Sequence, residues 1–225
     1  MNCGKTNVAR VALLWVLPFV CGCHSGKFMA PDKWVRRPES TVAADVARQG
    51  HGRMQIIICY ERYWSTHAVV RLVSSDGTAI LWDPGGGYWV HDPEAVGRLA
   101  DLVTSNVPTL EQWWAYRRSF TCEPFNTVFE WETSPGDAER LEAALRKAAT
   151  ALDGTCRFRT DVIRGQCGLA ISDYLHLFGA PYVTIRKRYL WPHDLGRHLW
   201  HQNPDRVTVF RVESGMEVWT QRISK

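Results

Sequence analysis

The pattern that most constrains the fold is a β-hairpin signal at residues 66–83. Thr66 to Val73 is rich in β-branched residues, residues 74–77 read Ser-Ser-Asp-Gly, and Thr78 to Asp83 resumes the strand pattern. A turn sequence of this kind between two such runs is typical of antiparallel strands that follow each other directly. We therefore expect the core to be built on an antiparallel sheet.

Further strands and several helices are expected along the rest of the chain. Similar runs predict strands at 55–60, 126–132, 207–213 and 217–223, the last two joined by a Ser-Gly turn. Capping and periodicity signals predict helices at 92–103, from Thr109 onward, at 134–152 and at 166–178. Because 45% of the 225 residues are apolar, this order of elements predicts a single α+β domain.

The first 22 residues have the features of an export signal. Lys5 and Arg10 frame the start of an uncharged run from 11 to 20, which is too short to span a bilayer. The Cys-Gly-Cys sequence that ends at Cys23 resembles a bacterial lipoprotein signal, although Cys21 is atypical two places before cleavage. The resemblance implies acylation of Cys23 and, with His24 next, an outer-membrane lipoprotein that faces the periplasm. An ordinary signal peptide, or a plain hydrophobic start, remains the alternative.

Residues 23–52 are expected to form a polar tether, because they are rich in polar residues and contain Pro31 and Pro38. The folded domain is then expected to occupy residues 53–225. The formal net charge of +4 is spread without long basic blocks, which makes nucleic acid an unlikely class of partner. A membrane contact through the lipid on Cys23 is the expected partner instead.

Cys167 opens the apolar helix predicted at 166–178. A helix N-terminus favours the thiolate, and its free N–H groups can hold an oxyanion, so this position suits a nucleophile. A small buried cysteine on the packed face of the helix fits the same pattern. His67 lies inside the predicted strand 66–73, where rigid neighbours would hold an imidazole that acts as the base.

The order of these features resembles the circularly permuted NlpC-like branch of the papain superfamily, in which lecithin retinol acyltransferase is a relative. The resemblance rests on His67 ahead of a hairpin, on the Trp-Asp-Pro sequence around Asp83, on Cys167 at a helix start, and on residues 192–195. It implies a papain-like, permuted NlpC-type antiparallel sheet with packed helices. It also implies an oxyanion site at Gln166 and the Cys167 N–H, although many members have Asn where this chain has Gln166.

Asp83 is the candidate that would orient His67, and the hairpin turn decides whether it can. If residues 75–77 form a three-residue loop with Gly77 left-handed, Asp83 lies opposite Val69 and shares a face with His67. If Asp76 and Gly77 alone form the loop, Asp83 faces away. The sequence leaves both arrangements open, and a plain turn residue before a proline is a third interpretation of Asp83.

The remaining cysteines and histidines give no metal or cofactor signal. In an oxidising compartment Cys59, Cys122, Cys156 and Cys167 allow several pairings, and Cys122 with Cys156 is one option. His193, His198 and His201 lack an acid or cysteine at metal-ligand spacing. Neither a metal nor a cofactor is expected.

The sequence therefore predicts an envelope-anchored cysteine hydrolase or acyltransferase with Cys167 as nucleophile, His67 as base and Asp83 as orienting group. The family resemblance implies cell-wall peptide amides or lipid acyl bonds as substrates. Two alternatives remain open: a non-catalytic envelope lipoprotein that uses the same fold as a binding or assembly module, and a disulfide-bonded Cys167.

Overall fold

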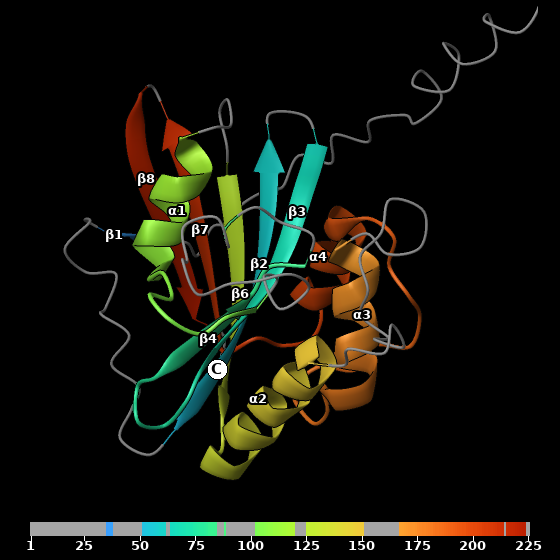
Figure 1. The fold of residues 1–225 in the computed structure, drawn as a ribbon. Helices are drawn as coiled ribbons and strands as arrows, with labels where there is room; N and C mark the ends of the chain where they lie inside the picture. The colour runs from blue at the N-terminus through green and yellow to red at the C-terminus, as the bar shows by residue number, and fades with distance from the viewer. Residues whose placement is uncertain are drawn as a thin grey trace, which may run out of the picture.

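A single antiparallel sheet with helices on both faces forms the fold (Figure 1). The computed structural model of the chain describes residues 35–37, 51–61, 64–84, 88, 102–119, 125–150, 167–213 and 215–223. In this part of the chain, eight strands pair in the order β1-β8-β7-β6-β2-β3-β4-β5. They are β1 (Val35–Arg37), β2 (Gly52–Glu61), β3 (Trp64–Val73), β4 (Ala79–Trp82), β5 (Leu102–Val103), β6 (Phe125–Thr133), β7 (Arg206–Glu213) and β8 (Met216–Ile223).

The helices within the described residues are α1 (Leu110–Arg118), α2 (Pro135–Thr150), α3 (Cys167–Phe178) and α4 (Pro192–Trp200). The α+β class and the antiparallel sheet are as predicted, and both expected hairpins are present. One local prediction was wrong, because Leu102 and Val103 pair with β4 as a strand and do not end a helix. The rest of that predicted helix lies outside the described residues. A further difference is β1, which pairs with β8 and falls within the stretch expected to be a tether.

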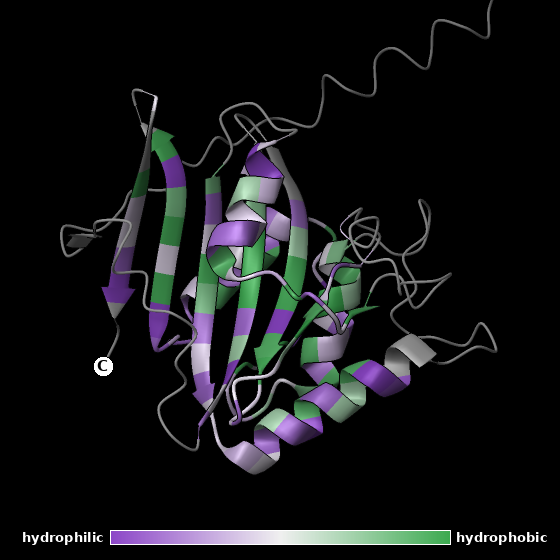
Figure 2. Cartoon of the chain, turned by 60° about the vertical axis from the view of Figure 1, so that its left-hand side comes forward, coloured by the Kyte–Doolittle hydropathy of each residue, from purple (hydrophilic) through white to green (hydrophobic). Residues whose placement is uncertain are grey.

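The two faces of the sheet bury different apolar clusters, because successive side chains of a strand point to opposite sides. On one face α2, α3 and α4 pack against β2 and β3, and on the other α1 packs with Trp113 and Trp114 buried to 1% exposure. Figure 2 shows the apolar residues concentrated on the strands and on the helix sides that face them. Trp113 and Trp114 therefore serve the core.

Local sequence signals explain where the helices begin and end. Thr109 and Gln112 form a reciprocal capping box at the start of α1. The Ser134 hydroxyl accepts a hydrogen bond from the Asp137 N–H at 3.2 Å and so caps α2. After α3 ends, a β-carbon on Gly179 would lie 2.5 Å from the Leu175 carbonyl oxygen, so the chain needs glycine there.

Across the described residues, no helix has the length and apolarity needed to cross a bilayer.

Candidate active site

His67 and Asp83 project from the same face of the sheet and contact each other. The β3–β4 register pairs Val70 with Trp82, which places Asp83 opposite Val69, one residue pair beyond the end of β4. The Oδ1 atom of Asp83 forms a short hydrogen bond with Nε2 of His67. The second carboxylate oxygen accepts the Tyr88 N–H at 3.0 Å. Asp83 is 1% exposed and His67 is 9% exposed, so the pair is shielded from water.

The turn between β3 and β4 decides this arrangement. The Ser74 N–H donates to the Thr78 carbonyl at 2.8 Å, and Gly77 has a φ of +87°. These features leave residues 75–77 as a three-residue loop with a left-handed glycine at its end. The sequence left two loop lengths open. The structure has the three-residue loop, which places Asp83 on the same face as His67.

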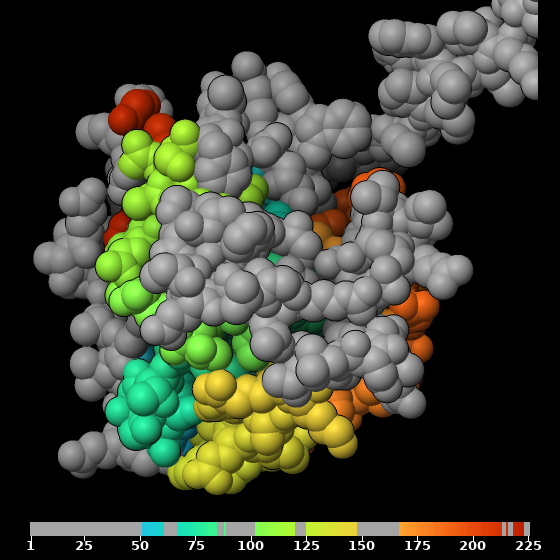
Figure 3. Space-filling view, viewed as in Figure 1, coloured from blue at the N-terminus to red at the C-terminus, as the bar shows by residue number. Residues whose placement is uncertain are grey.

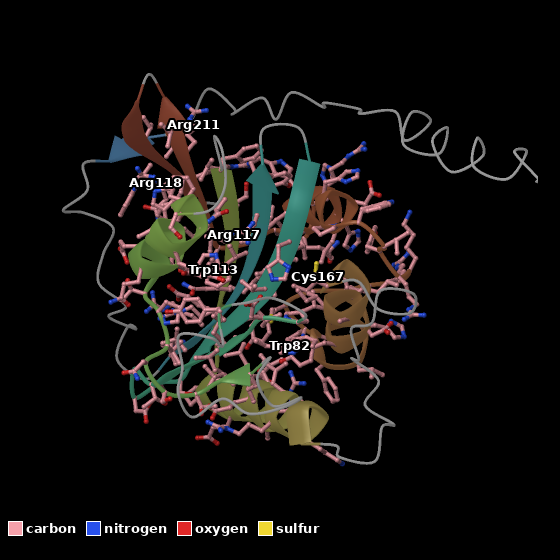
Figure 4. The ribbon with its side chains drawn as sticks, turned by 45° about the horizontal axis from the view of Figure 1, so that its top comes forward. Trp82, Trp113, Arg117, Arg118, Cys167 and Arg211 are labelled. Atoms are coloured by element: carbon pink, nitrogen blue, oxygen red, sulfur yellow. The ribbon has the colours of Figure 1, made fainter. Side chains whose placement is uncertain are left out.

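Cys167 reaches His67 from the other side of the sheet. It is the first residue of α3, and α3 packs on the face opposite to that of His67. Within the described residues β4 pairs β3 only from Val70 to Val73, which leaves the edge of β3 near Ala68 open to the start of α3. The backbone of Ala68 and the side chain of His67 both hydrogen-bond to the Cys167 thiol. Figure 4 shows the Cys167 sulfur beside β3.

The pKa values of the thiol and the imidazole shift in opposite directions. Burial alone would raise the pKa of Cys167, but the hydrogen bond and charge of His67, together with backbone hydrogen bonds from Ala68 and Gly168, lower it below its ordinary 9.0. Burial alone would lower the pKa of His67, yet the charge and hydrogen bond of Asp83, with a smaller effect of Cys167, raise it well above 6.5. The arrangement therefore favours a thiolate beside an imidazolium.

Several side chains around this pair were not singled out by the sequence. Tyr88, Trp113 and Tyr116 form an aromatic cluster next to Asp83, with ring centroids 4.8 to 5.5 Å apart. Cys59 lies directly across from His67 in the β2–β3 ladder, and burial raises its pKa. Cys59 comes to the site through the β2–β3 hairpin, whose pairing the sequence did not predict. The packing of α1 against the same face of the sheet brings the aromatic residues.

Several other residues that the sequence singled out lie outside the described part of the chain. Gln166, Cys23, the signal at 1–22 and the Cys122–Cys156 pairing lie outside. Cys167 carries a free thiol, which argues against the disulfide alternative.

The histidines near the C-terminal helix have partners within the protein: His193 contacts Asp194, and His198 contacts the Thr184 carbonyl oxygen. A search of the described residues finds no group of three or more potential metal ligands.

Comparison of the chain with protein-family models, with curated proteins and with solved structures finds no match in any of the three. Function is therefore inferred from the geometry and chemistry of the site itself.

Proposed function

We propose that the protein is an envelope-anchored thiol hydrolase or acyltransferase that acts on amide or ester bonds through Cys167, His67 and Asp83. One observation carries the proposal: a buried imidazole lies between a carboxylate and a thiol at the start of a helix. Each group has the neighbour that its catalytic role requires. The permuted NlpC-like, papain-type fold and the lipid anchor on Cys23 belong to the same proposal and rest on the sequence resemblance.

In this mechanism the Cys167 thiolate attacks the carbonyl carbon of the substrate and forms a tetrahedral oxyanion. The free N–H groups at the start of α3 would hold that oxyanion, with the Gln166 amide as a further candidate donor. The His67 imidazolium donates its proton to the leaving amine or alcohol as the tetrahedral species collapses to an acyl-enzyme. Neutral His67 then takes a proton from water, or from a second alcohol or amine, which attacks the thioester and releases Cys167.

Two features of the site favour hydrolysis or acyl transfer over a purely structural role for this cluster. Asp83 has both carboxylate oxygens engaged, one by His67 and one by the Tyr88 N–H, so the imidazole is held in one orientation. Cys167 is only partly buried, whereas Cys59 in the same region is fully buried. Partial exposure of Cys167 is what an incoming carbonyl needs in order to reach the thiol beside His67.

The test is alkylation of the full-length protein by iodoacetamide across a pH series, with each cysteine followed by peptide mass. We expect Cys167 to react with an apparent pKa below the ordinary 9.0 of a cysteine thiol. His67→Ala should remove this reactivity at neutral pH, because the thiolate loses its counter-ion. Cys59 is the internal control, since its burial and raised pKa predict no reaction until the protein unfolds.

An unreactive Cys167, or one that reacts equally well in His67→Ala, would rule out the enzyme and leave the non-catalytic binding module as the better interpretation. If the reactivity behaves as expected, esters of short and long acyl chains and peptide amides are the next substrates to compare. Cys167→Ser should abolish turnover of whichever class is cleaved.

A further inference from the structure

An exposed apolar and basic loop lies directly beside the candidate active site. Leu190 and Trp191 are each 43% exposed, which is unusual for side chains of this size. They follow three consecutive basic residues, Arg186, Lys187 and Arg188, which are also exposed. We call residues 186–191 the basic-aromatic loop. It belongs to the connection between α3 and α4, which is drawn in orange in Figure 1 and reaches the molecular surface in Figure 3.

The backbone of this loop is fixed to the first turn of α3. The Ser172 hydroxyl donates to the Gly168 carbonyl oxygen at 2.7 Å and accepts the Tyr189 N–H at 3.1 Å. A β-carbon on Gly168 would lie 2.9 Å from the Leu190 carbonyl oxygen and 3.2 Å from the carbonyl carbon of Trp191. Because Gly168 follows Cys167 in the chain, the exposed Leu190 and Trp191 lie next to the candidate nucleophile.

Two further contacts hold the connection on either side of Arg186 and Lys187. The His176 ring Nδ1 hydrogen-bonds to the Ile185 carbonyl oxygen at 2.7 Å, and Arg188 forms an ion pair with Asp173 at 2.7 Å. Leu190 and Trp191 are therefore exposed on a stretch of backbone that several hydrogen bonds and an ion pair hold in place. A chain that is held in place while it presents apolar side chains to water is typical of a docking surface.

The charges around the loop are predominantly positive. Asp173 offsets Arg188, and Asp194 contacts His193. Among the described residues, Arg186 and Lys187 form no ion pair with an acidic side chain. Tryptophan and leucine beside lysine and arginine is the combination that partitions into the interface of a bilayer with anionic headgroups. A protein partner matched to Leu190 and Trp191 alone would not require these cations.

We propose that the basic-aromatic loop docks onto an anionic bilayer surface, with Trp191 and Leu190 inserted at headgroup depth and Arg186 and Lys187 against the anionic lipids. Docking in this orientation brings the start of α3 to the membrane surface. If Cys167 is the nucleophile proposed above, the enzyme then acts on bonds presented at the bilayer interface rather than on substrates free in solution.

The experiment reconstitutes the full-length chain in vesicles of phosphatidylcholine, alone or mixed with phosphatidylglycerol, that also contain brominated lipid. Tryptophan emission is compared between the wild type and Trp191→Phe, so that the difference reports Trp191 alone and any hydrophobic N-terminal segment cancels. We expect the Trp191 emission to be quenched and blue-shifted in anionic vesicles and much less so in neutral ones. Added salt should weaken the quenching.

Matched variants separate the two parts of the surface. Arg186→Gln with Lys187→Gln should lower the ratio of docked to undocked loop by about fivefold per removed cation, whereas Arg146→Gln with Lys147→Gln on α2 should leave it unchanged. Leu190→Ser should also weaken docking. Leu177→Ser is its control, because Leu177 is equally exposed at 44% but lies on α3 outside the loop.

Absence of quenching in anionic vesicles overturns the proposal, and so does equal quenching in neutral vesicles or in the Arg186 and Lys187 variant. Docking is measured without turnover, and Cys167→Ser should dock like the wild type. Normal alkylation of Cys167 with no docking would reject this inference alone. Docking with an unreactive Cys167 would instead reject the proposed enzyme and keep the membrane surface.

Discussion

The imidazole of His67 has two different neighbours, and each uses a different ring nitrogen. Asp83 contacts Nε2, which leaves Nδ1 available for the hydrogen bond between His67 and the Cys167 thiol. Asp83 thus fixes both the orientation of the ring and the position of its protons. The charge of Asp83 raises the pKa of His67, and the charge of His67 in turn lowers the pKa of the Cys167 thiol.

Asp83→Asn preserves the shape of this side chain and removes its charge. The pKa of His67 should fall, because the carboxylate is the main group that raises it, and the pKa of Cys167 should rise in response. Each unit of that rise lowers the thiolate at neutral pH about tenfold, so we expect at least a tenfold slower alkylation of Cys167. The measurement is the rate of iodoacetamide reaction across pH.

Asp76→Asn is the matched control for this substitution, because Asp76 lies in the exposed turn of the same hairpin and accepts hydrogen bonds from the Thr78 N–H and hydroxyl. Its alkylation profile should match that of the wild type. An unchanged profile in Asp83→Asn would show that Asp83 does not orient or charge His67.

Among the elements, the contact between α3 and the basic-aromatic loop sets the position of Cys167. Gly168→Ala would place a methyl group within 3.0 Å of backbone atoms of Tyr189 and Leu190, which cannot move independently of the loop. Overpacking of this kind costs about 1 to 3 kcal/mol of unfolding free energy. We expect a lower midpoint in denaturant and a slower alkylation of Cys167, since α3 or the loop must shift.

The comparison for this prediction is Gly136→Ala in the first turn of α2, where a β-carbon has no neighbour within 4 Å. Alanine is the better helix former, so this variant should be neutral or more stable by up to about 1 kcal/mol. If both variants behave alike, the close approach of the loop to Gly168 has no energetic role.

The sequence predicted elements well where the signal was local. The hairpins, α2 and α3 follow from turn residues, caps and periodicity within a few positions, and Cys167 at a helix start was part of the same pattern. Asp83 was left undecided, because two turns of different length fit the same Ser-Ser-Asp-Gly sequence. Leu102–Val103 and Val35–Arg37 form short strands only because distant strands offer edges to pair with, and no local pattern reports that.

At the scale of the whole molecule, a row of buried polar side chains joins four strands on the same face of the sheet as His67. Arg71 on β3 donates to Gln55 on β2 at 3.0 Å, Gln55 donates to Glu130 on β6 at 2.5 Å, and Arg206 on β7 pairs with Glu130 at 3.2 Å. Arg71 also donates to the Pro108 carbonyl oxygen at 3.0 Å, ahead of α1. The row therefore links the sheet to the helix that covers the site.

Glu130→Ala should be strongly destabilising, because it leaves Arg53 and Arg206 without the carboxylate near which both lie. Removal of one partner from a buried ion pair costs about 3 to 5 kcal/mol, and we expect the lower end because Arg206 is partly exposed. Denaturant unfolding measures the change. Glu139→Ala on the exposed side of α2 is the control and should lose little; a similar small loss in Glu130→Ala would contradict the role of the row.

The site joins elements from both faces of the sheet, so its protonation is coupled to folding of the whole domain. The folded protein holds the proton on His67 above pH 6.5, where the unfolded chain releases it, because the pKa is raised in the folded state. The stability from this proton is therefore complete below pH 6.5 and is lost as the pH rises through the folded pKa. The contribution of Cys167 to the stability has the opposite pH dependence, since its pKa is lowered from 9.0 in the folded protein.

Cys167→Ser isolates the contribution of the His67–Asp83 pair, because the serine hydroxyl does not titrate in this range. We expect the free energy of unfolding of Cys167→Ser to fall as the pH rises above 6.5, and the double variant with His67→Asn to lose most of that slope. The slope is the diagnostic quantity, since removal of the imidazole also lowers stability at every pH. Parallel pH profiles of the two proteins would show that His67 does not retain its proton in the folded domain, and the thiolate–imidazolium pair would then lack its positive member.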